Sequence, residues 1–142
     1  MKVLSIKEPY ATLIKMKHKK IETRSWKTKY RGELYIHASI SKASKKLLEK
    51  DFMKSLVTEQ DLSYGKIILK ANLVDCIEMT KEWIEKLKKE NPQEYLLGLY
   101  EEGRYAWILE NVTPLEQPII AKGKLGIWNY EEKEYNDGKS SK

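Results

Sequence analysis

The chain has 142 residues, of which 41% are hydrophobic, so it is long enough to bury a core as one domain and too apolar for wholesale disorder. Its single cysteine, Cys76, permits no internal disulfide and no cysteine zinc cluster, and with only two histidines we expect neither a metal site nor a cofactor. The first ten residues lack the apolar segment of a secretory signal, and no apolar run approaches the ~20 residues of a membrane span. We therefore expect a cytoplasmic protein that does not enter a membrane.

The net charge of +6 is unevenly distributed along the chain. Residues 1–50 carry 14 Lys and Arg against 4 Asp and Glu, whereas residues 51–142 carry 13 against 17. The surplus is densest in Lys15–Arg31, here called the basic segment, which holds eight Lys or Arg and one acid, Glu22. This polarity predicts attraction to polyanions and fits a nucleic-acid partner.

The first third of the chain predicts a strand, a helix and two more strands. The apolar run in Lys2–Lys7 indicates the first strand. Pro9 suits the first position of the helix, whose inward face is apolar at helical spacing: Tyr10, Leu13 and Ile14. Strands are expected over Ile21–Trp26 and, from strict alternation, over Glu33–Ser39, with a basic loop between them.

The middle of the chain predicts helices around one long strand. Ser41 or Ser44 can cap a helix with apolar residues at Leu47, Leu48, Phe52 and Leu56. Ile67–Ile77 is a β-rich run too long to remain flat in a small domain without a bend or bulge. Thr80 can open a helix that continues to Lys89, and Asn91 has the capping-box spacing for a short helix with Pro92 at its first position.

Two last strands are expected over Tyr105–Leu115 and Ile119–Tyr130, interrupted near Pro114 and Pro118. Residues 131–142 are polar and without periodicity, which predicts a loose tail after a domain of residues 1–130. Helices interrupt the strands irregularly, which argues against a doubly wound parallel sheet. The pattern favours an α+β fold: a small mixed β-barrel of about six strands with helices packed around it.

Three charged residues of the basic segment predict a polar ligand site. Glu22 and Arg24 are two apart, so on a strand both side chains leave the same face, and Lys19 can join them. Such a trio can donate to phosphate or carbonyl oxygens and accept from an amino or hydroxyl group. The alternative is a structural ion pair between Glu22 and Arg24 beside a solvated lysine run.

Further ligand contacts are expected from the aromatic and imidazole side chains. Trp26, Tyr30 and Trp128 can stack on bases, although aromatic residues on short strands also serve as core. His37 leaves the apolar face of its strand, where it is either a proton carrier or ligand donor, or a hydrogen-bonded structural residue.

Several motifs of the chain resemble those of a known family. SIKEPYATLI, the spacing Lys19-x-x-Glu22-x-Arg24, SWKTKYRGELYIHAS and the later YAWILEN and KGKLGIW are similar to the ASCH domain of the PUA-like superfamily, named for its homology to a transcription coactivator. The likeness covers roughly residues 1–130. The family signature is G-x-K-x-x-E-x-R, and here Lys17 stands at the position of the glycine, which costs about 1 kcal/mol if that position needs a positive φ.

The resemblance implies a PUA-like barrel whose cleft, between barrel and first helix, takes single-stranded RNA, another single-stranded nucleic acid or a nucleoside. The expected ligand contacts combine the residues of the signature with nearby charged and aromatic side chains. They are Lys17, Lys19, Glu22, Arg24, Trp26, Tyr30, Arg31, His37 and Trp128. The sequence leaves the oligomeric state open.

Two other functions follow from the same resemblance. Related amidohydrolases deacylate N4-acetylcytidine with a Lys, a Thr and a Glu, and ribonuclease activity is attached to bacterial members. Lys19 matches their lysine, but Glu22 stands where they have threonine, so Lys19 and Glu22 are catalytic candidates only. Beside Glu22 we expect Lys19 to remain protonated. The third possibility is a protein-interaction module of a transcription or RNA-processing complex.

Overall fold

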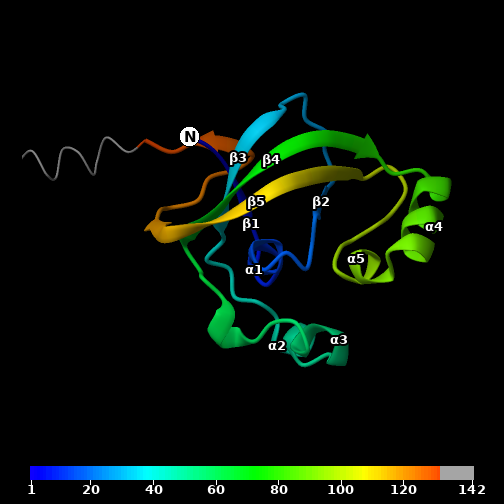
Figure 1. The fold of residues 1–142 in the computed structure, drawn as a ribbon, viewed down its shortest axis with the longest axis horizontal. Coiled ribbons are helices and arrows are strands. Elements are labelled where there is room, and N and C mark those ends of the chain that lie inside the picture. Colours follow the sequence, from blue (N-terminus) through cyan, green and yellow to red (C-terminus); the bar gives the residue numbers. More distant parts are fainter. Residues whose placement is uncertain (132–142) are drawn as a thin grey trace, which may run out of the picture.

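The computed structural model describes residues 1–131, which form one mixed sheet with short helices around it (Figure 1). The strands are β1 (Lys2–Ile6), β2 (Ile21–Arg24), β3 (Gly32–Ala38), β4 (Lys66–Glu78), β5 (Tyr105–Ile120) and β6 (Ile127–Asn129). The helices are α1 (Tyr10–Lys15), α2 (Lys45–Leu48), α3 (Asp51–Lys54), α4 (Lys81–Glu90), α5 (Pro92–Leu96) and the 3₁₀ turn η1 (Glu59–Asp61). The tail predicted for residues 131–142 lies, beyond Glu131, outside the described residues.

The six strands are ordered β2-β5-β4-β3-β1-β6. β1 and β3 are parallel, and every other neighbouring pair is antiparallel. The sheet curls around α1 (Figure 1), and no pairing between the edge strands β2 and β6 occurs in residues 1–131. The fold is therefore an α+β half-barrel with helices packed around it, which confirms the predicted PUA-like architecture.

The long strands β4 and β5 bend because their pairing is interrupted. The register between them shifts at three places, between Ile67 and Leu69, Lys70 and Asn72, and Leu73 and Asp75. At each shift, one of the two strands has extra residues without a partner in the other strand. Such bulges increase the local twist. The bend predicted for Ile67–Ile77 is thus confirmed.

Two strands follow, as predicted, but the break predicted near Pro114 and Pro118 is wrong. β5 continues through Pro114 and Pro118 to Ile120, and β6 is only three residues long. Prolines are tolerated because β5 pairs with β2 only as far as Ile108 and beyond that point has a single neighbour, β4. Pro118 also falls inside a register shift, where no ladder hydrogen bond is required of it.

Helix α1 lies on the concave side of the sheet, where its Ile14 is fully buried, while its Leu13 is buried in a second cluster with Met53 and Leu97. Pro9 precedes this helix instead of opening it. The buried Glu8 carboxylate accepts the backbone N–H of Thr12 and of Ser63, both at 2.8 Å, and so joins the start of α1 to the segment after η1. The main core lies between α1 and the sheet, with Trp107 at its centre.

The helices outside the sheet begin at the predicted caps. The Ser44 hydroxyl accepts Leu47 N, but two short helices, α2 and α3, replace the single helix expected there. Thr80 caps α4 by accepting Trp83 N, and Asn91 caps α5 by accepting Glu94 N, both at 3.1 Å. In the described chain, no helix has the length and apolarity to span a membrane.

Candidate ligand-binding cleft

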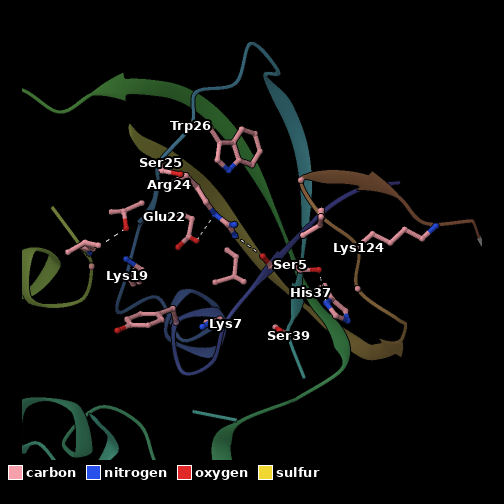
Figure 2. Close-up of a pocket in the computed structure, with 18 of the residues that line it drawn as sticks. Ser5, Lys7, Lys19, Glu22, Arg24, Ser25, Trp26, His37, Ser39 and Lys124 are labelled. Carbon is pink, nitrogen blue, oxygen red and sulfur yellow. Dashed lines mark hydrogen bonds and ion pairs between the residues drawn. The ribbon is translucent and has the colours of Figure 1, made fainter. Parts of the chain in front are cut away.

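A cavity of about 850 Å³ lies between α1, strand β2, the segment after α5 and the loop 121–126 (Figure 2). Five of the nine predicted contact residues line it: Lys19, Glu22, Arg24, Trp26 and His37. The signature trio therefore converges on one cleft beside the first helix, as the sequence predicts. That these residues contact a ligand stays a prediction.

Lys19 forms the deep end of the cleft. Its side chain is only 1% exposed, and its Nζ lies 3.8 Å from Glu94 Oε2 and 5.8 Å from the centre of the Tyr10 ring. In residues 1–131, Lys19 Nζ and Arg24 Nε are the buried side-chain polar atoms that make no hydrogen bond. A buried ammonium with unused donors is costly, so this end of the cleft is suited to a ligand that brings an acceptor atom.

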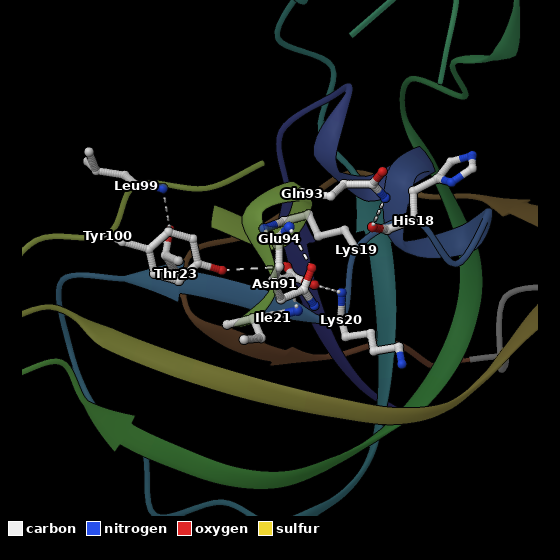
Figure 3. A network of polar contacts seen from close by, with 10 residues as sticks. All are labelled: His18, Lys19, Lys20, Ile21, Thr23, Asn91, Gln93, Glu94, Leu99 and Tyr100. Atoms are coloured by element: carbon white, nitrogen blue, oxygen red, sulfur yellow. Dashed lines mark hydrogen bonds and ion pairs between the residues drawn. The ribbon is translucent and has the colours of Figure 1, made fainter. Parts of the chain in front are cut away.

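Glu94, a residue of helix α5, is the acidic neighbour of Lys19 (Figure 3). Its carboxylate accepts the backbone N–H of Lys20 at 2.8 Å and of Ile21 at 3.2 Å, and the Tyr100 hydroxyl lies 3.5 Å from Oε2. It thereby joins α5 to the start of β2. The capping-box spacing places Glu94 in the first turn of α5, and no local signal indicates a partner 74 residues away.

Burial lowers the pKa of Lys19, and the nearby carboxylates of Glu22 and Glu94 oppose that effect. The direction is opposite to the one expected from Glu22 alone, because the sequence did not reveal how deeply Lys19 is buried. Burial, followed by the charges of Glu94 and Glu22, raises the pKa of the Tyr100 hydroxyl. Tyr100 therefore remains a neutral neighbour of the carboxylates.

Gly98 lets the segment after α5 approach Lys19 closely. A Cβ at this position would lie 2.8 Å from Tyr100 Cε2 and 3.2 Å from both Lys19 Nζ and Thr23 Cγ2. The first distance is too short for real side chains, and the others are tight. The wall that covers Lys19 therefore depends on a residue without a side chain.

Glu22 and Arg24 leave the same face of β2, as predicted. Arg24 Nε lies 3.0 Å from Glu22 Oε2, without the alignment of a hydrogen bond, and Arg24 Nη2 donates to the Ser5 carbonyl at 2.7 Å. The ion pair proposed as the alternative is thus present, and it lies within the cavity wall (Figure 2). Arg24 can pair with Glu22 and still contact a ligand, because its guanidinium group has five N–H donors.

Trp26 lies at the rim of the cavity and is 38% exposed. Its ring meets the buried Trp107 edge-on, with centroids 4.8 Å apart, and its carbonyl accepts Trp107 Nε1 at 3.2 Å. This support holds an indole ring at the opening of the cleft. The geometry fits the predicted stacking role.

His37 lies at the opposite end of the cavity from Lys19 and is 1% exposed. Nδ1 lies 2.9 Å from Ser5 Oγ, and Nε2 lies 2.8 Å from the Ala121 carbonyl. Trp128 is 6% exposed, does not line the cavity, and donates through Nε1 to Ser5 Oγ at 3.1 Å. Trp128 therefore lies behind the cavity wall, not on its surface.

Lys17, Tyr30 and Arg31 also lie outside the cavity lining. Lys17 lies just after α1 and has a φ of 68°. Its backbone N–H donates to the Ile14 carbonyl, and the N–H of His18 donates to the Leu13 carbonyl. This is a Schellman motif, so the signature glycine position does take a positive φ.

The side chains of Tyr30 and Arg31 form hydrogen bonds within or next to their own loop. The Tyr30 hydroxyl donates to the Glu33 carbonyl, and Arg31 Nη1 donates to the Thr28 carbonyl at 3.0 Å. Arg31 Nη2 also lies 3.7 Å from Asp75 Oδ1. These contacts hold the loop between β2 and β3, away from the cleft.

Several cavity residues were missed from the sequence. None of them belongs to the basic segment or its signature: Ser5, Lys7, Leu99, Arg104, Lys122 and Lys124. The family likeness is the one available signal for four of them, because Ser5 and Lys7 lie in SIKEPYATLI and Lys122 and Lys124 in KGKLGIW. Among the described residues, no three His, Cys, Asp or Glu side chains are grouped as metal ligands.

The half-barrel and its polar cleft beside the first helix define the class as a PUA-like α+β domain. The family model of the ASCH domain matches residues 4–119, so the chain belongs to the ASCH domain family.

Two solved structures share the fold. The ASCH protein from Zymomonas mobilis superposes with a TM-score of 0.58 at 16% identity, covering 98% of this chain and 93% of that one. A point variant of the same protein gives 0.58 at 15% identity, covering 98% and 96%.

Curated relatives are longer than this chain. Activating signal cointegrator 1 from Homo sapiens is 25% identical over 137 residues, and its counterpart from Mus musculus is 25% identical over 139. The match covers 96% of this chain and 23% of each relative. The chain thus spans about a quarter of the length of these relatives.

Proposed function

We propose that this ASCH domain binds single-stranded RNA and takes one of its bases, or a free nucleoside, into the cleft. The observation that carries the proposal is the buried Lys19 ammonium, which lines a cavity and has no hydrogen-bond partner in the described chain. A base carbonyl or ring nitrogen supplies the missing acceptor.

The rest of the cleft complements a base and its backbone. Glu22 offers carboxylate oxygens to an amino group, and Trp26 presents an indole ring at the rim. Lys7, Lys122 and Lys124 are exposed and line the cavity toward its other end, where they can meet phosphates. This combination of a stacking ring with a basic groove is typical of single-strand binding.

Fluorescence anisotropy with a labelled mixed-sequence RNA tests the proposal. Because the basic segment and the cleft lysines displace counterions, the logarithm of affinity should fall steeply and linearly with the logarithm of salt concentration, by about 0.7 per phosphate neutralised. Lys81→Ala, on the far helix α4, serves as a charge-matched control and should leave affinity nearly unchanged. A flat salt plot would remove the hypothesis.

A second function, hydrolysis of an N4-acylated cytidine, is favoured by one observation, the position of the buried Lys19 amine beside Glu94 in the cavity that Glu22 also lines. Here Glu22 would activate water while Lys19 stabilises the tetrahedral oxyanion. We expect little turnover, because no threonine stands at the Glu22 position. Cytidine release from N4-acetylcytidine, lost in both Lys19→Ala and Glu22→Ala, would instead establish an amidohydrolase.

A further inference from the structure

Ser5 and His37 form a hydrogen-bonded pair at the end of the cleft away from Lys19, where the proposed base contacts do not reach. Ser5 and His37 are direct partners in the parallel pairing of β1 with β3, so both side chains leave the same face of the sheet. Both line the cavity, and Figure 2 shows them side by side. Their polar atoms are 2.9 Å apart, which is hydrogen-bond distance.

The partners of His37 determine its tautomer. The Ala121 carbonyl can only accept, so the ring nitrogen facing it, Nε2, carries a proton. In the neutral ring Nδ1 is then the acceptor, and the Ser5 hydroxyl donates to it. Trp128 Nε1 occupies one lone pair of Ser5 Oγ at 3.1 Å, which leaves the second lone pair for attack.

We propose that Ser5 is a nucleophile activated by His37 as general base, and that it acts on a carboxylic ester whose alcohol part is anionic. A serine bonded to a histidine base that is oriented by a third group is the arrangement that activates hydroxyl nucleophiles. Here a backbone carbonyl, that of Ala121, is the orienting group.

The backbone at Gly123 packs closely against this pair. A Cβ at Gly123 would lie 2.8 Å from Ser5 Oγ and 2.9 Å from His37 Cε1, so any side chain there would press on both reactive groups. The register of β3 with β4 also shifts between Ile36 and His37. Bulges of this kind re-aim side chains next to reactive sites.

Positively charged side chains line the same cavity as the Ser5 hydroxyl. The Arg24 guanidinium is held against Ser5 by its bond to the Ser5 carbonyl and retains further donors for a developing oxyanion. Lys7, Lys122 and Lys124 line the same cavity and are exposed. They suit a substrate whose alcohol part carries a phosphate or sulfonate.

The reaction balances without a further reagent. Ser5 Oγ attacks the ester carbon while His37 Nδ1 takes the hydroxyl proton, and the negative charge collects on the carbonyl oxygen near Arg24. The bond to the alcohol oxygen then breaks, and that oxygen receives the proton from Nδ1. Water repeats the sequence on the acylated Ser5, which releases the acid and restores the hydroxyl.

The test is covalent labelling of the full chain with a serine-directed fluorophosphonate probe, with the modified residue located by tandem mass spectrometry. We expect the label on Ser5, its loss in Ser5→Ala and at least a tenfold slower reaction in His37→Gln. Ser41→Ala, an exposed serine outside the cavity, should label at the wild-type rate. Circular dichroism verifies that each variant is folded.

Substrate charge gives a second measurement. Turnover of 4-acetoxybenzenesulfonate should exceed that of phenyl acetate, and Lys124→Ala should reduce only the former. Absence of label from Ser5 in the folded wild-type chain overturns the proposal, as does labelling that is undiminished in His37→Gln. Labelling requires no RNA, so its outcome is separate from that of the proposed RNA binding.

Discussion

Lys19 and Lys20 are neighbours in the chain with the same side chain and opposite surroundings. Lys19 is buried against Glu94 and lines the cleft, whereas the side chain of Lys20 is exposed and only its backbone N–H meets Glu94. Of the eight cations in the basic segment, Lys19 and Arg24 alone line the cavity. Charge density therefore identifies the region, but position in or just before β2 decides which cations form the site.

The largest effect should come from removing the carboxylate that makes burial of Lys19 possible. Glu94→Ala leaves two backbone N–H groups without their acceptor and a buried ammonium without its counter-ion, so the free energy of unfolding should fall by about 3 kcal/mol. Chemical denaturation measures this loss. Glu85→Ala, at an exposed position of α4, should change stability by less than about 0.5 kcal/mol, and equal losses would contradict the supporting role.

The comparison of the two lysines can be made directly by binding. Lys19→Met removes the buried charge at similar length and should weaken RNA binding at least about tenfold, since the cleft loses an ammonium whose hydrogen-bond donors are free for a ligand. Lys20→Met removes one exposed charge and should weaken it less than about threefold. Anisotropy titrations at one salt concentration measure both. If the two variants bind alike, the cleft is not the site.

Arg24 sharpens the comparison through geometry rather than charge. Arg24→Lys keeps the charge but cannot hold Glu22 and the Ser5 carbonyl together, so affinity should fall about fivefold. Lys27→Ala removes an exposed charge outside the cavity and should cost about twofold. Thermal melts of both variants establish that the fold is intact. A larger loss in Lys27→Ala would favour a diffuse basic surface.

The smallest effect is expected from substitutions of Lys17, where the backbone conformation matters more than the charge of the side chain. Its φ of 68° is unfavourable for a residue with a Cβ, so Lys17→Gly should raise the free energy of unfolding by about 1 kcal/mol. Lys17→Ala removes the same charge without relieving the strain and should bring no such gain. Denaturant midpoints of the two variants separate backbone from charge, and a gain in both would point to charge repulsion.

The sequence by itself determined the elements whose signals are local. Alternation in Glu33–Ser39 predicts β3, and capping side chains at Ser44, Thr80 and Asn91 predict where helices begin. The signature spacing also places Glu22 and Arg24 on one strand face, because side chains alternate with a period of two. These features depend on residues only a few positions apart.

The tertiary structure alone decided the features that depend on distant segments. The continuity of β5 through Pro118 depends on which neighbours the strand has, and the environment of Lys19 depends on Glu94, 75 residues later. The Ser5 and His37 pair likewise depends on the pairing of β1 with β3 and on Ala121 from the end of the domain. Burial and hydrogen-bond partners arise from packing between elements, which local periodicity does not encode.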